Sequence, residues 1–285
     1  RVRFMALIAL LSMIAAISVA VVSYQFTVTN AVREAKIKGE LIYEYMNASR
    51  DFFREQQLPR VYEAAGREFF IPEIMSAFAV LRGVFESFAQ SNQDYIFKQA
   101  TKNPLVPSNK ADEKELELIS FFNENRKIDK KEGQMVKEGQ NYYYFAKPVR
   151  VPDETCLECH GDPADASDEQ LDIYGEENGY YWEVDDTVST LIIYVPIQKA
   201  IDRARKLAVS LFVTGAAGIG VLMLIIWFFF SRYIVKPLVM LEQRATEISL
   251  GKNLQERVVT RSQDEIGSLG RAVDRLRISI DKMLT

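Results

Sequence analysis

The sequence predicts an α+β domain held between two membrane-spanning helices and followed by a pair of amphipathic helices. Three observations lead to this class. Two uncharged apolar runs, residues 4–22 and 207–230, bracket about 180 residues of mixed composition. Helical patterns fill the first half of that stretch, and strand-forming segments follow in its second half. Beyond the second run, apolar residues recur every three or four positions.

The apolar runs hold 19 and 24 residues without a charge, and about 20 residues cross a bilayer as a helix. The alternative for the first run is a cleaved signal peptide, but no convincing small-residue cleavage site precedes Tyr24. We therefore expect a retained anchor. Basic residues flank the outer ends of both runs: Arg1, Arg3, Arg232 and Lys236. The positive-inside rule then predicts cytoplasmic termini.

The resulting organisation has four parts. We expect a first transmembrane helix at residues 4–26, an extracytoplasmic domain at 27–206, a second transmembrane helix at 207–230 and a cytoplasmic helical pair at 231–285. The formal net charge of −4 gives no reason to expect nucleic-acid binding.

The domain is expected to begin with helices. The first, over residues 30–57, continues the first span outward and ends at Leu58-Pro59. The second is predicted over 72–91 from its apolar spacing, and the third over 112–125 from its acidic first turn.

Strand signals follow the helices. They lie at residues 141–151, 179–184 and 187–197, which are rich in aromatic and β-branched residues. We expect these segments to form an antiparallel sheet.

Between the first two predicted strands lie both cysteines and the only histidine of the chain: Cys156, Cys159 and His160. C-x-x-C-H is the attachment signal for a c-type haem, in which two thiols bond to the porphyrin vinyl groups and the histidine binds the iron. We therefore expect one covalently attached haem c, held by Cys156 and Cys159, with His160 as an iron ligand.

Three other readings of this motif are weaker. A redox dithiol usually follows a strand and opens a helix, whereas Pro152 and Pro163 place this motif in a loop. A structural zinc site needs four ligands, and the chain has no further Cys or His. A disulfide across two residues would be strained.

The second axial ligand stays open: Met, Tyr, Lys or an exchangeable water. A methionine would give six-coordinate iron and raise its potential, whereas an open site would favour binding of NO, CO or O₂. Met46 ranks before Met75 because it lies off the main apolar stripe of its helix, although a methionine in such a helix usually fills the core.

We expect the haem to lie between the sheet and the early helices. Arg82, on the opposite edge of its helix from Phe78, is expected either to pair with a haem propionate or to lie on the solvated surface. The aromatic side chains near Tyr174, Tyr180 and Trp182 would wall the haem or form part of the core.

The C-terminal helices carry two apolar stripes, at Leu238, Leu241, Ala245 and Ile248 and at Ile266, Leu269, Val273, Leu276, Ile280 and Met283. With Pro237 and the sequence Asp264-Glu265-Ile266-Gly267, they resemble a HAMP domain. Each stripe is too narrow to be buried within one chain, so we expect a homodimer through HAMP and the transmembrane helices. Small residues in the second span would allow close helix approach.

Several motifs of the domain occur in a fixed order: Phe70-Ile71-Pro72, residues 77–82, 103–112 and 146–149, the C-x-x-C-H motif with Gly161-Asp162-Pro163, Tyr174-Gly175 and Tyr194-Val195-Pro196. Together they resemble a family of periplasmic PAS-like domains with one covalent haem c, over roughly residues 30–200. The resemblance implies a PAS-like sheet and sensing of redox state or a diatomic gas. Some members use a second axial Cys, but this chain has no third Cys, so that role is not carried over.

We therefore expect a haem c sensor in the bacterial inner membrane, with its sensor domain periplasmic, that signals through HAMP to a cytoplasmic partner. The effector is expected either beyond Thr285 or on a separate protein. The alternative is a membrane-anchored cytochrome that transfers electrons to a redox partner. An enzyme such as a peroxidase is not expected, because the chain has no distal His to act as acid and base.

Overall fold

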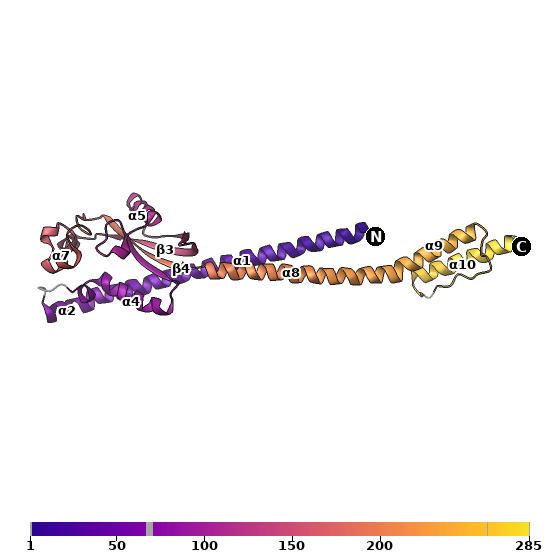
Figure 1. Cartoon of the computed structure of the whole chain (residues 1–285), viewed down its shortest axis with the longest axis horizontal. Coiled ribbons are helices and arrows are strands. Elements are labelled where there is room, and N and C mark those ends of the chain that lie inside the picture. Colours follow the sequence, from indigo (N-terminus) through magenta and orange to yellow (C-terminus); the bar gives the residue numbers. More distant parts are fainter. Residues whose placement is uncertain (1, 67–70, 261, 285) are drawn as a thin grey trace. The chain divides into compact units, whose positions relative to one another are not determined.

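A computed structural model describes residues 2–66, 71–260 and 262–284 of the chain. It divides into two compact units: Tyr24–Lys206, and Arg1–Ser23 together with Leu207–Thr285. Figure 1 gives the order of the elements along the chain. Three residues named in the sequence analysis, Arg1, Phe70 and Thr285, lie outside the described residues.

The first helix, α1 (Val2–Phe52), runs without interruption from the apolar run into the domain. A π-helical turn, η1 (Phe53–Gln57), and a further helix, α2 (Leu58–Ala65), continue it. The prediction that the helix ends at Leu58-Pro59 is therefore wrong. Pro59 lies in the first turn of α2, where its missing N–H costs no helical hydrogen bond.

The predicted helix over residues 72–91 is two helices, α3 (Pro72–Met75) and α4 (Ala77–Ser91). Ser76 between them has an extended backbone, and its hydroxyl oxygen accepts a hydrogen bond from the backbone N–H of Ala79 at 3.3 Å. The serine is thus the N-cap of α4, and the apolar spacing that crosses it concealed the break.

The sheet has four antiparallel strands in the order β1-β4-β3-β2. Their bounds are Ile96–Thr101 for β1, Lys131–Lys137 for β2, Gln140–Arg150 for β3 and Thr187–Pro196 for β4. The predictions for β3 and β4 are confirmed, but β1 and β2 were missed. The predicted strand at 179–184 is wrong, because Gly179 and Tyr181 have φ values of +84° and +60°.

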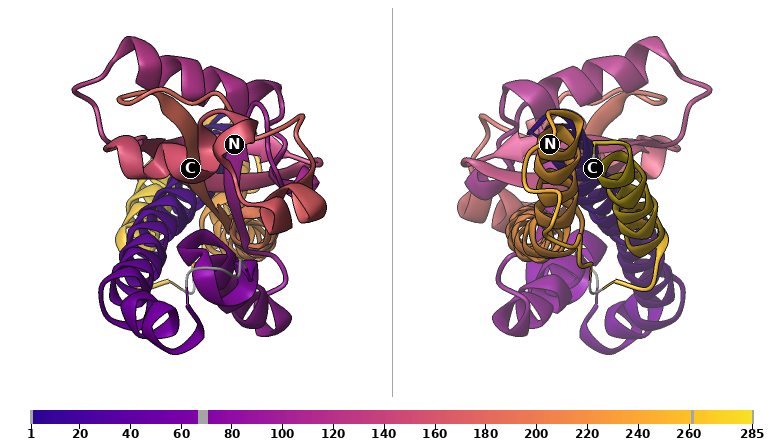
Figure 2. Two further views of the ribbon diagram at one scale, coloured as in Figure 1. Left: turned by 90° about the vertical axis from the view of Figure 1, so that its left-hand side faces the viewer. Right: turned by 90° about the vertical axis from the view of Figure 1, so that its right-hand side faces the viewer.

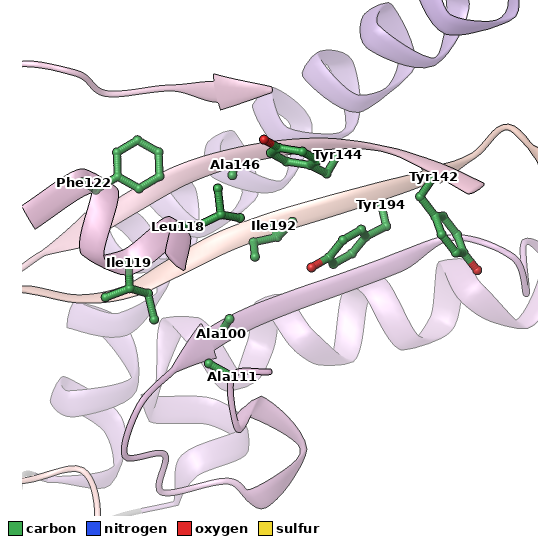
Figure 3. Packing of buried hydrophobic residues seen from close by; sticks show 10 residues of the cluster. All are labelled: Ala100, Ala111, Leu118, Ile119, Phe122, Tyr142, Tyr144, Ala146, Ile192 and Tyr194. Carbon is green, nitrogen blue, oxygen red and sulfur yellow. The ribbon is translucent and has the colours of Figure 1, made fainter. Parts of the chain in front are cut away.

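The two faces of the sheet carry separate clusters, as strand alternation requires. On one face, side chains of β3 and β4 pack against α5 (Glu113–Glu124), the third predicted helix, which is confirmed (Figure 3). On the other face, Phe145 and Ile193 pack against Ala35 of α1. Figure 2 gives two further views of the ribbon.

A buried charge network holds α5 to the first face. Glu115 is fully buried and accepts hydrogen bonds from Lys98 at 2.7 Å, Lys137 at 2.8 Å and the Tyr194 hydroxyl at 2.8 Å. Glu115 also forms a capping box with Asp112 at the start of α5. Every charge in the network has a partner, which is the condition for burying charges without a large penalty.

The connection from β3 to β4 contains only short helical segments. They are η3 (Glu154–Cys156), α6 (Leu157–His160), η4 (Pro163–Asp165) and α7 (Asp168–Tyr174), and a similar turn, η2 (Pro107–Asn109), follows β1.

The other unit contains the start of α1, the part of α8 (Gln198–Phe229) from Leu207 onward, a π-helical turn η5 (Phe230–Val235), α9 (Lys236–Ser249) and α10 (Glu265–Leu284). The predicted amphipathic pair is confirmed: Leu241 and Ile248 of α9 are buried with Val258 of the connector and contact α10. Two helical stretches, Met5–Ala64 and Gln198–Ser249, contain segments long and apolar enough to cross a membrane, a test that a signal sequence near the N-terminus also passes.

Candidate functional site

Cys156, Cys159 and His160 lie together in the connection between β3 and β4. The segments η3 and α6 form one helical stretch there, so positions i, i+3 and i+4 project to the same side. Asp153 begins this stretch, and its carboxylate accepts a hydrogen bond from the Thr155 N–H at 3.0 Å. Both cysteines are free thiols. The three residues predicted to act together are therefore adjacent in space.

The imidazole of His160 has one nitrogen committed to the protein. Its Nδ1–H donates to the carbonyl oxygen of Gly179 across 2.7 Å, which leaves Nε2 with a free lone pair. The Trp182 indole stacks on the imidazole, and the backbone N–H of Trp182 donates to the backbone carbonyl of His160 at 3.0 Å. Burial lowers the pKa of His160, which favours the neutral form that ligates a metal.

Gly179 is required by this arrangement for two reasons. Its φ of +84° lies in the left-handed region, and a Cβ atom there would lie 2.5 Å from Cγ of Leu105. A glycine therefore allows its carbonyl to reach His160. The sequence offered no signal for this role beyond the presence of a glycine.

Gln170 of α7 holds the backbone of the helical stretch that carries the cysteines. This role was not predicted from the sequence. Its side chain is 1% exposed, and its Nε2 donates to the Cys159 carbonyl at 2.7 Å and to the Tyr180 hydroxyl at 3.3 Å. Tyr180 is buried and does not line the cavity described next, whereas Tyr174 and Trp182 do.

A cavity of about 940 Å³ opens beside these residues. Cys156, Cys159 and His160 line it, together with the end of α1, the helix α4, the strands β1 and β4 and the segment after β1. It lies within the size range of pockets that enclose cofactors. The cavity thus lies between the early helices and the sheet.

The donor set fits a haem. Two thiols and a neutral imidazole with Nε2 free share one wall of a cavity whose other walls include Phe78, Phe85 and Leu191. These are the groups that a c-type haem uses for attachment and for its proximal iron ligand.

The other readings of the motif fit less well. Burial and the nearby Asp153 carboxylate raise the pKa of Cys156, whereas a redox dithiol needs a lowered one. Among the residues that the structure describes, no cluster of three or more His, Cys, Asp or Glu side chains could hold a metal ion.

The residues predicted to contact the haem from outside the C-x-x-C-H motif differ in their relation to the cavity. Met46 is buried in an apolar cluster with Leu81 and Phe85, and it is not among the described residues that line the cavity. Met75 lines the cavity, and its sulfur accepts a hydrogen bond from the Ile71 N–H at 3.4 Å. Arg82 also lines the cavity, and its Nε lies 3.7 Å from a Glu86 carboxylate oxygen.

Two protein-family models match this chain. The model of the Tll0287-like family matches residues 28–196, and the model of the HAMP domain matches residues 229–282. Among solved structures, the cyanobacterial heme-protein Tll0287 is similar over 57% of this chain and 95% of its own, at 15% identity and a TM-score of 0.43. The comparison with curated proteins found no match.

Proposed function

The chain belongs to the Tll0287-like family and continues into a HAMP domain, and on this premise we propose that it is a membrane sensor that carries one covalent haem c. The haem, bound to Cys156 and Cys159 with His160 on its iron, would supply a centre that changes oxidation state or binds a diatomic gas. A Tll0287-like domain followed by HAMP supports a role in signal transduction, and we propose no enzymatic activity for these two domains.

The observation that carries this proposal is the hydrogen bond of His160. Its Nδ1 donates to Gly179, and Nε2 is left free at the wall of a cavity lined by both thiols. A free cysteine pair beside an oriented, neutral imidazole is the set of groups that covalent haem attachment requires.

We further propose a PAS-like sensor domain at residues 27–206, placed in the periplasm of a bacterial inner-membrane protein. The four-stranded antiparallel sheet with its long N-terminal helix supports the PAS-like assignment. The basic residues at the outer ends of the two spans support cytoplasmic termini, with spans at 4–26 and 207–230 and HAMP at 231–285.

Signalling is proposed to pass through a homodimer to a cytoplasmic protein. Leu269, Leu276 and Met283 are exposed on α10 at intervals of seven residues, and Leu238 is exposed on α9. An apolar stripe of this kind is covered when a second copy completes a parallel helical bundle. A bundle with two packings of similar free energy could transmit the state of the haem.

One of two methionines is proposed as the sixth iron ligand: Met46 ranks first from the sequence pattern, whereas the place of Met75 in the cavity wall favours Met75. Arg82 is proposed to pair with a haem propionate, because it lines the same cavity and a guanidinium matches the two oxygens of a carboxylate.

The test is the absorption spectrum of the purified full chain, oxidised and reduced, with and without CO, after expression in a host that attaches haem c. We expect a haem band that persists after denaturation and acid extraction. A Cys156→Ser/Cys159→Ser variant should lose its haem under the same treatment. Absence of a haem band in the wild-type chain would disprove the proposal.

The second candidate, a membrane-anchored electron carrier, is favoured by one observation. Cys159 is exposed, which would bring that edge of a haem close to solvent and to a redox partner. A carrier needs the same ligands in both oxidation states. A sensor is instead indicated by a change of ligand, or by binding of CO.

A further inference from the structure

The wall of the cavity has an excess of positive charge. Among the described residues that line it, the cationic ones are Arg50, Arg54, Arg82, Lys98 and Arg150, whereas the one carboxylate is Glu86. A cavity with such a wall favours an anionic occupant. Guanidinium groups in particular match the two oxygens of a carboxylate.

Two of these cations have partners that hold them toward other parts of the domain. Lys98 donates to Glu115 at 2.7 Å and to the Lys110 carbonyl at 2.6 Å. Arg150 donates from Nη2 to the carbonyl of Ile128 at 3.1 Å. The arginines of α1, η1 and α4 remain as the groups best placed for an occupant.

Arg50 and Arg54 come from the same end of the first helix. Arg50 lies in the last turn of α1, and Arg54 lies in the π-helical turn η1. The guanidinium carbon of Arg50 is 5.8 Å from the ring centre of Phe78 on α4, so its side chain extends across to the second wall of the cavity.

Each of these arginines keeps donors available. Arg50 donates to the carboxylate of Asp51 from Nη2 at 3.2 Å and from Nε at 3.4 Å, and Arg54 Nη2 lies 3.5 Å from the carboxylate of Glu55. Both pairs join sequence neighbours on the helix surface, and neither carboxylate lines the cavity. Because a guanidinium has five N–H donors, these contacts leave donors free on both arginines.

We propose that Arg50 and Arg54 bind a propionate carboxylate of the haem, so that the haem is tied to the end of α1 as well as to Arg82 of α4. This inference rests on the proposed function, because it needs a haem in the cavity. The π-helical turn supports it, since such turns are frequent at functional sites.

The consequence concerns the route of the signal. α1 is one helix from Val2 to Phe52, and it therefore joins this arginine pair directly to the first membrane span. A change of charge at the haem would act on the first span through Arg50 and Arg54, in addition to any action through β4 and the second span.

The experiment compares midpoint potentials of the haem-loaded full chain in detergent at pH 8. The Arg50→Gln/Arg54→Gln variant should have a lower potential than the wild type, because two positive charges no longer favour the reduced haem. The Arg50→Lys/Arg54→Lys variant keeps both charges and should return toward the wild-type potential. Arg33→Gln is the matched control: Arg33 is exposed on α1, bonded to Asn30, and outside the cavity.

Three outcomes would overturn the inference while leaving the haem in place. The glutamine variant could keep the wild-type potential, or the glutamine and lysine variants could shift equally, which would indicate repacking. A wild-type potential that responds to added phosphate, and loses that response in the glutamine variant, would indicate a site for a free anion. If the double variant does not fold, Arg50→Gln and Arg54→Gln alone decide between the same outcomes. A wild-type chain without haem would instead disprove the proposed function.

Discussion

The imidazole of His160 and the indole of Trp182 are stacked, with ring centres 3.9 Å apart and planes 9° from parallel. This contact and the hydrogen bond to Gly179 act on one ring from two directions. The stacking restrains the plane of the imidazole, and the hydrogen bond restrains its rotation within that plane. A proximal ligand held in this way keeps a constant direction toward the iron.

Replacing Trp182 by Leu should loosen this ligand. We expect a loss of about 1 kcal/mol of stability, the usual value of an aromatic pair, and a broadened haem spectrum. Thermal unfolding and low-temperature spectra of the haem-loaded chain measure both. Trp227→Leu is the control, because Trp227 is the other tryptophan of the chain and lies on α8 in the second candidate membrane span. Equal effects of the two variants would contradict a specific role of the stacking.

Replacing Gly179 by Ala should damage the site more than the same change at Gly175. Both glycines have positive φ, at +84° and +71°, but only at Gly179 would the new Cβ meet Leu105. The strain at either position costs about 1–3 kcal/mol, and the clash adds to it only at Gly179. Thermal unfolding and haem content are the measurements. A Gly175→Ala variant as damaged as Gly179→Ala would refute the steric argument.

Acid should destabilise the domain through Glu115. Burial alone would raise the pKa of Glu115, but hydrogen bonds from Lys137 and Lys98 outweigh it and lower the pKa below the ordinary 4.5. The folded chain therefore binds fewer protons than the unfolded chain near this pH. The stability contributed by the pairing is present above about pH 4.5 and is lost as the pH falls through the folded pKa.

The measurement is the melting temperature from pH 7 down to pH 3. Glu115→Gln should cost about 3 kcal/mol of stability at pH 7, because it removes the buried carboxylate that pairs with the half-buried Lys98 and Lys137, and it should flatten the acid dependence. Glu117→Gln on the exposed side of the same helix is the control and should change neither. An unchanged slope in Glu115→Gln would assign the acid sensitivity to other groups.

Binding of CO to the reduced haem can show which of the two methionines is the iron ligand. Because Met75 lines the cavity and Met46 does not, we expect Met75→Leu to make the reduced haem bind CO. Met46→Leu should leave the spectrum unchanged and lower the free energy of unfolding by less than about 1.5 kcal/mol, as volume-conserving core substitutions do. The opposite pattern would assign the ligand to Met46. A wild-type haem that already binds CO would show that neither is a firm ligand.

The exposed stripe of α10 predicts the effect of a charge in the HAMP domain. Leu276→Glu should weaken dimerisation more than tenfold, since a buried unpaired carboxylate costs about 2 kcal/mol or more. Light scattering of the full chain in detergent gives the mass. Ile278→Glu is the control, because Ile278 is also exposed on α10 but lies two residues away, on another face. Equal weakening by both would argue against the stripe.

The parts of the fold that could be predicted from sequence carry strong local signals. β3 and β4 are central strands with continuous aromatic and aliphatic residues, and α5 begins with a capping box. β1 and β2 escaped because they are the edges of the sheet, and their sequences are correspondingly mixed with polar residues.

The candidate site shows the same division. Cys156, Cys159 and His160 are adjacent in sequence, so their proximity could be predicted. Arg50 and Gln170 reach the site through tertiary packing, from segments about 100 residues before the motif and 10 residues after it. No local pattern distinguishes them from ordinary surface residues, which is why sequence reasoning missed both.

The π-helical turn η5 sets the rotational phase of everything that follows it. An α-helix advances by about 100° per residue, and a π turn inserts one extra residue into that count. The buried apolar face of α9, which contains Leu241 and Ile248, is therefore rotated about the helix axis. Its direction differs by about 100° from the one that a continuous heptad count from α8 would give. If η5 converted to α-helix, α9 would rotate about its own axis by about 100° relative to α8.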